Sequence, residues 1–316
     1  MQLLRSLMFV PGHRPRMVQR ALGLGEFAPS ALDVAILDLE DGVPPDEKDR
    51  ARAAIAAAIA LPSNAEGPAR YVRVNRDPRS RDADLAAVLR PGLEGIVAPK
   101  IDRAEEVASL VRDLDEREDA AGIARGSIRL VPSIESAQGL LEANAIAAFS
   151  DRVVALLFGA EDFARDLSLP TEREAEAAEL VYARSAVVVA ATAARRQAID
   201  GIWPDVTDGE GLRRDASQGR RLGFRGKSLI HPGQIEIVND VFSPSPAEVS
   251  YARRVVAAFE DGQAKGHGAV ALDGKLLDQP IVERARQMLL LHEAVLRKQR
   301  TPPVERPAAL EGKLLK

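Results

Sequence analysis

The chain alternates short apolar runs with longer helical patterns eight times, and this alternation limits its possible folds more than any other feature. A short run of apolar and β-branched residues predicts a strand, whereas a longer run with helical periodicity predicts a helix. Strict alternation of the two is typical of a parallel sheet, because each helix returns the chain to the same edge. The predicted strands cover residues 4–10, 34–39, 71–75, 95–99, 128–134, 153–158, 199–203 and 227–230.

Helical patterns separate these strands. Eight predicted strands with helical patterns between them, in a chain of this length, fit a (β/α)8 TIM barrel. The pattern alone leaves a doubly wound open sheet as the alternative, and the length also allows two domains. The predicted helices cover residues 15–24, 45–61, 81–89, 103–118, 138–149, 172–196 and 209–222.

Residues beyond the eighth unit exceed what a barrel needs, because two more helical patterns follow at 246–263 and 280–300. We therefore expect residues 1–240 to form a catalytic barrel. Residues 241–300, called the C-terminal extension below, are expected to form a helical lid. The proline-bearing residues 301–316 are expected to form a flexible tail.

Charge and composition exclude several classes of protein. Lys plus Arg is 43 and Asp plus Glu is 47, so the net charge of −4 argues against nucleic-acid binding through phosphates. The absence of cysteine excludes disulfides, zinc–thiolate sites and cysteine nucleophiles, and it suits a cytoplasmic location. The longest apolar run, 186–194, is about half of the ~20 residues that span a membrane. Arg5 interrupts the apolar N-terminus, so we expect no signal peptide and no membrane partner.

Carboxylates gather directly after the predicted strands, where barrels place their active sites. Such a cluster repels itself unless a cation is present, and the lack of cysteine favours a hard, oxygen-binding cation such as Mg²⁺. Glu135 and Asp162 follow adjacent predicted strands and are the economical pair of ligands. A lone carboxylate after a strand is also a common helix N-cap, so that role stays open. The acidic residues in question are Asp38, Glu40, Asp41, Glu135, Glu161 and Asp162.

Arg73 stands inside an apolar predicted strand, on the opposite side from Val72 and Val74. An arginine that points into a barrel is costly unless it is paired. Its planar fork suits a carboxylate, which is either the carboxylate of an anionic substrate or a neighbouring Asp or Glu side chain.

Seven short motifs stand in order at the ends of the predicted strands: Phe-Val-Pro-Gly (9–12), Ile-Leu-Asp-Leu-Glu-Asp-Gly-Val (36–43), Arg-Val-Asn (73–75), Pro-Lys (99–100), Ile-Glu-Ser (134–136), Gly-Ala-Glu-Asp (159–162) and Ser-Leu-Ile-His-Pro-Gly-Gln (228–234). In this register the chain resembles the citrate lyase beta-subunit and malyl-CoA lyase group of the HpcH/HpaI aldolase family, which belongs to the phosphoenolpyruvate/pyruvate barrel superfamily. The resemblance covers the chain up to about residue 295.

The resemblance implies a TIM barrel whose C-terminal extension helps to close a neighbouring subunit's site in a homo-oligomer, a trimer or hexamer. Mg²⁺ would be held by Glu135 and Asp162, and Arg73 would hold the carboxylate of the substrate. Asp278, in the C-terminal extension, matches an aspartate that acts in the partner subunit's site.

The resemblance also implies an acyl-CoA site at the barrel mouth. From the residues alone, His231 can equally be a hydrogen-bonded structural histidine, and Arg14 and Arg20 can be solvated helix charges. The residues expected to contact substrate or CoA are Phe9, Arg14, Arg20, Arg73, Glu161, Ile230 and His231.

The activity that follows is Mg²⁺-dependent cleavage or formation of a short 3-hydroxyacyl-CoA such as malyl-, citramalyl- or citryl-CoA. That chemistry needs a base for the 3-hydroxyl proton, a role that suits Asp278, and an electrophile for the developing oxyanion. Three alternatives stay open. They are a malyl-CoA thioesterase on the same scaffold, a non-catalytic CoA-binding subunit of a larger lyase complex, and a metal aldolase for free oxoacids.

Overall fold

The structure is a computed structural model, and it describes the predicted barrel and most of the C-terminal extension. The expected flexible tail, 301–316, and the first part of one predicted helix, 172–176, lie outside the described residues. The described residues are 2–27, 31–62, 67–170, 177–265 and 270–300.

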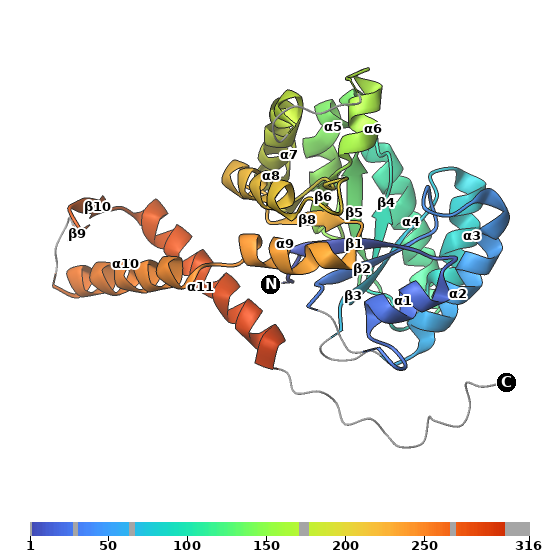
Figure 1. Ribbon diagram of the computed structural model, residues 1–316, viewed down its shortest axis with the longest axis horizontal. Coiled ribbons are helices and arrows are strands. Elements are labelled where there is room, and N and C mark those ends of the chain that lie inside the picture. Colours follow the sequence, from blue (N-terminus) through green and yellow to red (C-terminus); the bar gives the residue numbers. More distant parts are fainter. Residues whose placement is uncertain (1, 28–30, 63–66, 171–176, 266–269, 301–316) are drawn as a thin grey trace.

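Eight parallel strands close into a barrel (Figure 1). Closure comes from β1 pairing with β8, with Leu7 opposite Ser228, and it confirms the predicted TIM barrel over the open sheet. The strands are β1 (Ser6–Pro11), β2 (Val34–Asp38), β3 (Ala69–Arg73), β4 (Gly95–Ala98), β5 (Arg129–Ile134), β6 (Ala155–Phe158), β7 (Gln197–Asp200) and β8 (Gly226–Leu229).

Helices cover the outside of the barrel, and none of those described is long and apolar enough to cross a bilayer. Two of them, α6 and α9, were not predicted; they are short, with seven and eight residues, and begin inside or directly after the motifs at 159–162 and 228–234. The helices are α1 (Pro15–Leu22), α2 (Lys48–Ala60), α3 (Pro78–Val88), α4 (Ala104–Ala120), α5 (Ala137–Ala148), α6 (Ala160–Asp166), α7 (Val181–Ala193), α8 (Gly209–Leu222) and α9 (Ile235–Phe242), with short 3-10 turns η1 (Pro45–Glu47), η2 (Ala178–Leu180) and η3 (Pro232–Gln234).

The barrel interior holds a small apolar core of its own. The charged residues follow this core at the C-terminal ends of the strands. Side chains alternate along a strand, so every second residue points inward. On β2, Ile36 lies in this core and Asp38 follows in the same phase. On β3, Tyr71 lies in the core and Arg73 follows in the same phase. The site residues are therefore the top layer of the barrel's own packing.

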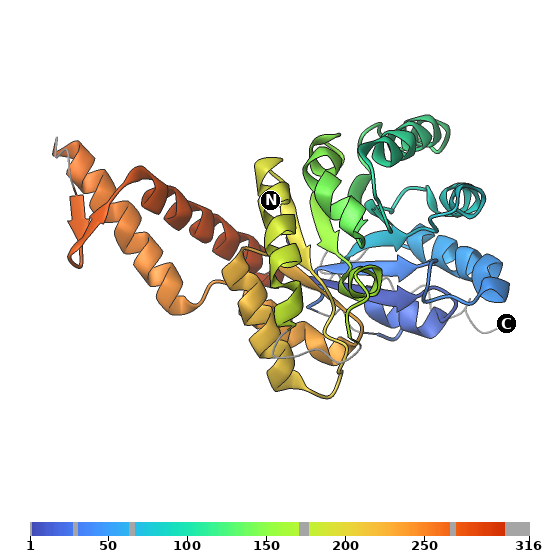
Figure 2. The same ribbon diagram turned by 90° about the horizontal axis from the view of Figure 1, so that it is seen from above.

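The C-terminal extension projects from the barrel as a pair of helices joined by a small hairpin (Figures 1 and 2). It has its own cluster of buried apolar side chains, separate from the barrel core. The hairpin was not predicted, because its strands have only three residues each. The elements are α10 (Pro246–Ala264), β9 (Val270–Leu272), β10 (Lys275–Leu277) and α11 (Gln279–Arg300).

Ion pairs fix the extension to the base of the barrel, at the end opposite the active-site face. Lys298 of α11 lies 3.2 Å from Asp33, a buried carboxylate that also pairs with Arg5 at 2.8 Å. Where α10 begins, Glu248 accepts two hydrogen bonds from Arg220 of α8, at 2.8 and 3.0 Å. Both ends of the extension are thus attached to the barrel.

We expect Asp33→Ala to lower the free energy of unfolding by about 3 kcal/mol, because it leaves the buried Arg5 without its carboxylate partner. Burial opposes ionisation, but Arg5 holds the pKa of Asp33 below its usual value. This stability is therefore present above the unfolded pKa and is lost as the pH falls. Urea unfolding of Asp33→Ala beside Asp151→Ala, an exposed pair with Arg196, measures the effect. Equal unfolding of the two variants would contradict it.

Candidate active site

Two carboxylates, Glu135 and Asp162, lie together at the mouth of the barrel. Glu135 directly follows β5 and is buried, and Asp162 stands in the first turn of α6. Burial, together with the hydrogen bond and the negative charge of Asp162, raises the pKa of Glu135 to about 8. Gly159 leaves room for the Glu135 side chain, since a Cβ atom at position 159 would lie 2.3 Å from the Cγ atom of Glu135.

This pair fits a Mg²⁺ ion. Neighbouring carboxylates repel each other when both are ionised, and a divalent cation between them removes that cost. The described part of the chain contains no group of three or more acidic or histidine side chains that could enclose a metal. Mg²⁺ is commonly bound by one or two carboxylates and keeps its other positions for water and substrate.

Arg73 lies beside the carboxylate pair in a fixed orientation. Its Nε and Nη2 atoms each donate a hydrogen bond of 2.7 Å to Asp38, and its Nη1 atom lies 3.1 Å from Glu40. Burial disfavours its charge, but Asp38 and Glu40 hold the pKa of Arg73 above the usual value. The ion pair with neighbouring carboxylates, one of the two alternatives from the sequence, is therefore present. Phe9 packs on the guanidinium, with 4.5 Å from Cζ to the ring centroid.

Asp38 also organises the loop that follows β2. Its two carboxylate oxygens accept hydrogen bonds of 2.9 Å from the backbone N–H groups of Glu40 and Gly42. A Cβ atom on Gly42 would lie 2.3 Å from the Asp38 carboxylate, so the turn requires glycine. The sequence predicted Asp38 only as one of several acidic residues after the strands. Its position shortly before Glu-Asp-Gly is the feature that could have indicated this hydrogen-bonded turn.

Lys100 is a site residue to which sequence reasoning gave no role. It follows β4 with a φ of 53°, and its ammonium donates to Glu40 and to Asp41 and lies 3.8 Å from Asp162. Burial opposes its charge, but the bonds with Asp41 and Glu40 hold the pKa of Lys100 above its usual value. Lys100 therefore neutralises part of the acidic cluster.

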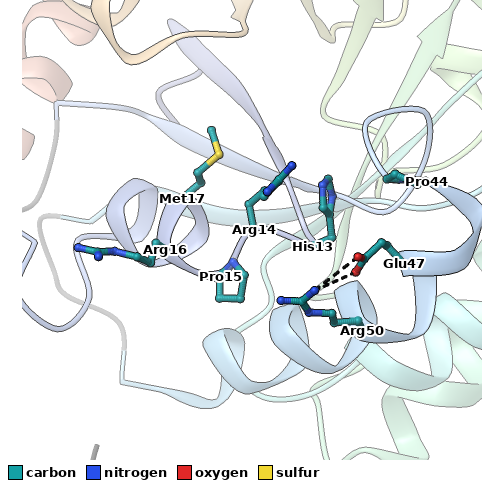
Figure 3. A pocket seen from close by; sticks show the side chains of 8 residues that line it. All are labelled: His13, Arg14, Pro15, Arg16, Met17, Pro44, Glu47 and Arg50. Carbon is teal, nitrogen blue, oxygen red and sulfur yellow. Dashed lines mark hydrogen bonds and ion pairs between the residues drawn. The ribbon is translucent and has the colours of Figure 1, made fainter. Parts of the chain in front are cut away.

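A cavity of about 340 Å³ lies beside the mouth, between the loop after β1 and the start of α2 (Figure 3). Arg14, expected at the CoA entrance, lines it together with two further arginines, so the cavity suits an anionic group. Arg20 is not among its lining residues and lies instead over the Phe27 ring, at 5.7 Å. The lining residues are His13, Arg14, Pro15, Arg16, Met17, Pro44, Glu47 and Arg50.

Other predicted contact residues lie around the mouth in positions that differ in exposure. Ile230 is 39% exposed just after β8. His231 is exposed and caps the turn η3, since its Nδ1 atom accepts a hydrogen bond of 3.1 Å from the backbone N–H of Gly233. Glu161 is exposed in the first turn of α6, next to Asp162.

Asp278 does not lie at the mouth of its own barrel. It stands where β10 ends and α11 begins, at the end of the C-terminal extension far from the barrel (Figures 1 and 2). Its carboxylate accepts a hydrogen bond of 3.1 Å from the backbone N–H of Ile281 and so caps α11. Within one chain the structure brings Arg73, Glu135 and Asp162 together, but not Asp278.

Comparison with known proteins identifies the family of the chain. The family model described as HpcH/HpaI aldolase/citrate lyase matches residues 5–232. Citrate lyase subunit beta of Haemophilus influenzae is 37% identical over 92% of this chain and 97% of its own. A (3S)-malyl-CoA thioesterase of Cereibacter sphaeroides is 37% identical, over 92% and 95%. The crystal structure of the protein CitE from Mycobacterium tuberculosis, in complex with magnesium, acetoacetate and coenzyme A, matches with a TM-score of 0.72 and 30% identity over 92% and 98%. The chain therefore belongs to the HpcH/HpaI aldolase/citrate lyase family.

Proposed function

We propose that this protein is a Mg²⁺-dependent carbon–carbon lyase that cleaves or forms a short 3-hydroxyacyl-CoA, such as malyl-, citramalyl- or citryl-CoA. The observation that carries the proposal is the carboxylate pair Glu135–Asp162 beside the buried guanidinium of Arg73. Relatives named as citrate lyase subunits, and a related structure with magnesium and coenzyme A, support the same chemistry.

Arg73 orients the substrate by its carboxylate, and Asp38 keeps the guanidinium fork in place. A base then takes the proton of the 3-hydroxyl group. The C2–C3 bond breaks, the hydroxyl carbon becomes a carbonyl, and the bonding electrons pass to the carbon beside the thioester as an enolate. Glu135 and Asp162 would hold the Mg²⁺ ion, which would supply Lewis-acid stabilisation of the negative charge that develops on the substrate.

The base in this proposal is Asp278 of a second subunit. The extension that carries Asp278 is attached at the base of its own barrel and projects away from that barrel (Figure 1). A homo-oligomer, a trimer or hexamer, would bring it to a neighbour's mouth. The arginine-lined cavity beside the mouth, which includes Arg14, would receive phosphate groups of CoA. The cysteine-free chain suits the cytoplasm, which we propose as its location.

A thioesterase is the second candidate, because the Cereibacter sphaeroides relative carries that name. Incubating the purified chain with Mg²⁺ and malyl-, citramalyl-, methylmalyl- or citryl-CoA, with products identified by mass, separates the candidates. The lyase is supported if the products are acetyl-CoA and an oxoacid, which is glyoxylate, pyruvate or oxaloacetate according to the substrate. For methylmalyl-CoA the corresponding acyl-CoA and oxoacid would support it. Malate with free CoA supports the thioesterase. Binding without any turnover would overturn both and indicate a subunit that needs partners.

We expect Mg²⁺ binding to strengthen as the pH rises toward 8 and to release a proton. Burial and Asp162 raise the pKa of Glu135 to about 8, so the metal-free site is protonated below that pH and must lose a proton to bind the cation. The apparent affinity should gain up to about tenfold per pH unit in this window. Calorimetry in two buffers of different ionisation enthalpy measures both quantities. An affinity independent of pH, with no proton release, would contradict the assignment.

A further inference from the structure

Lys48 stands at the start of α2 and donates three hydrogen bonds away from its own helix. Its Nζ atom donates to the backbone carbonyl oxygens of Leu39 and Glu40, at 2.5 and 2.7 Å. It also donates to the side-chain oxygen of Asn75, at 2.9 Å. An ammonium group has three N–H donors, so Lys48 uses all of them on the segments that follow β2 and β3. Lys48 therefore joins these two segments to each other and to α2.

Helix formation does not account for a lysine at this position. A positive charge in the first turn of a helix opposes the helix dipole. Burial also lowers the pKa of Lys48, although carboxylates such as those of Asp38 and Asp84 act in the opposite direction. The charge of Lys48 is thus unfavourable for α2 by itself, and the three hydrogen bonds offset that cost.

Asn75, the last residue of the Arg-Val-Asn motif, completes this network. Its side-chain nitrogen donates to the carbonyl oxygen of Leu39 at 2.9 Å and to Asp84 at 2.7 Å, and its backbone N–H also donates to Asp84, at 2.7 Å. Asp84 is fully buried on α3, which lies beside α2 (Figure 1), and its other oxygen accepts a bond of 2.8 Å from Arg52 of α2. Asn75 is thus held with its side-chain oxygen toward Lys48.

Glu40 links the network to the mouth of the barrel. Its backbone oxygen accepts the hydrogen bond from Lys48, while its carboxylate lies 2.5 Å from Lys100 and 3.1 Å from Arg73. Glu40 is buried, so the position of its carboxylate depends on the backbone that carries it. Lys48 therefore acts on Arg73 and Lys100 through Glu40.

We propose that Lys48 is a positioning residue of the active site, which holds the loop 39–43 so that Glu40 keeps Arg73 and Lys100 in place. The hold on the loop rests on these contacts alone, whereas its effect on turnover rests on the proposed function, in which Arg73 binds the substrate's carboxylate. That carboxylate does not react, so Arg73 contacts it alike in the ground state and in the transition state. Disturbing Arg73 through Glu40 therefore weakens substrate binding more than it slows the chemistry.

The first test compares the kinetics of Lys48→Met and Arg52→Met, with whichever of the four acyl-CoA substrates above the wild type turns over. Lys48→Met removes the bonds to the loop, whereas Arg52→Met removes a bond to Asp84 and leaves the loop bonds in place. We expect Lys48→Met to raise KM about tenfold, the size of one lost hydrogen bond to a charged group, with a smaller change in kcat. Arg52→Met should keep the wild-type KM.

This comparison separates positioning from general loss of structure. A variant that is partly unfolded has fewer active molecules, which lowers the apparent kcat but leaves KM unchanged. An unchanged KM in Lys48→Met, or an equal rise of KM in both variants, overturns the positioning role.

Hydrogen exchange of the full chain without substrate tests the hold on the loop independently of turnover. The backbone N–H groups of Glu40, Gly42 and Val43 are hydrogen-bonded in the structure, so they report on opening of the loop. We expect them to exchange about tenfold faster in Lys48→Met than in the wild type, and at the wild-type rate in Arg52→Met. Wild-type exchange in Lys48→Met overturns the proposal.

Asn75→Ala is a milder second variant for the case that Lys48→Met does not fold. It removes one of the three acceptors of Lys48 and leaves the two carbonyl oxygens, so KM and loop exchange should both rise, by less than tenfold. Wild-type values of both in Asn75→Ala would then overturn the proposal. If the wild type turns over none of the four substrates, the lyase is refuted, and loop exchange alone decides whether Lys48 holds the loop.

Discussion

Replacing Glu135 by glutamine, or Asp162 by asparagine, is expected to abolish Mg²⁺-dependent turnover of the acyl-CoA substrate. Each substitution keeps the size of the side chain but removes one of the two anionic oxygen ligands. Loss of residues that merely support metal ligands commonly costs 10–100-fold, so loss of a ligand should lower kcat/KM by at least about 100-fold. Steady-state kinetics across a Mg²⁺ titration, with metal binding measured by calorimetry, tests this expectation.

The matched controls are Glu116→Gln, near the C-terminal end of α4, and Asp151→Asn, after the end of α5, which make the same chemical changes at exposed positions at the base of the barrel. Both should retain wild-type kinetics and Mg²⁺ affinity. Glu135→Gln should also remain folded, because it removes a buried charge that Asp162 already disfavours. Wild-type turnover by both ligand variants would show that the cation, if any, binds elsewhere.

The barrel, and the meeting of Glu135 with Asp162 at its mouth, could be predicted because both follow from the local sequence pattern. Strands and helices have different periods, and a barrel places its chemistry directly after the strands, so the position of Glu135 follows from the apolar run before it. Barrel closure could not be predicted in this way. It depends on Leu7 meeting Ser228, and no periodicity reports a pairing between residues so distant in the chain.

The remaining parts of the site depend on conformations that a local pattern does not show. Lys100 reaches Glu40 and Asp41 from a left-handed backbone position, which neither a strand nor a helix pattern indicates. The sequence does not show whether the partner of Arg73 is an acidic side chain or a substrate carboxylate. Asp38 and Arg73 end the adjacent strands β2 and β3 in the same layer of the barrel, and no local pattern reports the contact between them. The direction of the C-terminal extension could not be predicted either, because it depends on the ion pair between Lys298 and Asp33, which lie near opposite ends of the chain.

Asp278→Asn should lower kcat by about 10²–10⁴-fold, the usual contribution of a positioned general base, while the KM for acyl-CoA stays nearly unchanged. Asp278 caps α11, and asparagine also caps helices well, so the extension should keep its structure. Thermal unfolding of the variant beside the wild type checks this. A large rise in KM with unchanged kcat would instead give Asp278 a role in binding.

Mixing inactive Asp278→Asn chains with inactive Glu135→Gln chains should restore activity if one subunit supplies the mouth and another supplies the aspartate. Glu135→Gln is the better partner than an Arg73 variant, since loss of Arg73 would strand the buried Asp38. In equal, randomly reassembled mixtures, a site is intact only when its mouth comes from an Asp278→Asn chain and its extension from a Glu135→Gln chain, so about one quarter of wild-type activity should return. If each chain used its own Asp278, no mixture could contain an intact site and activity would stay at the level of the separate variants.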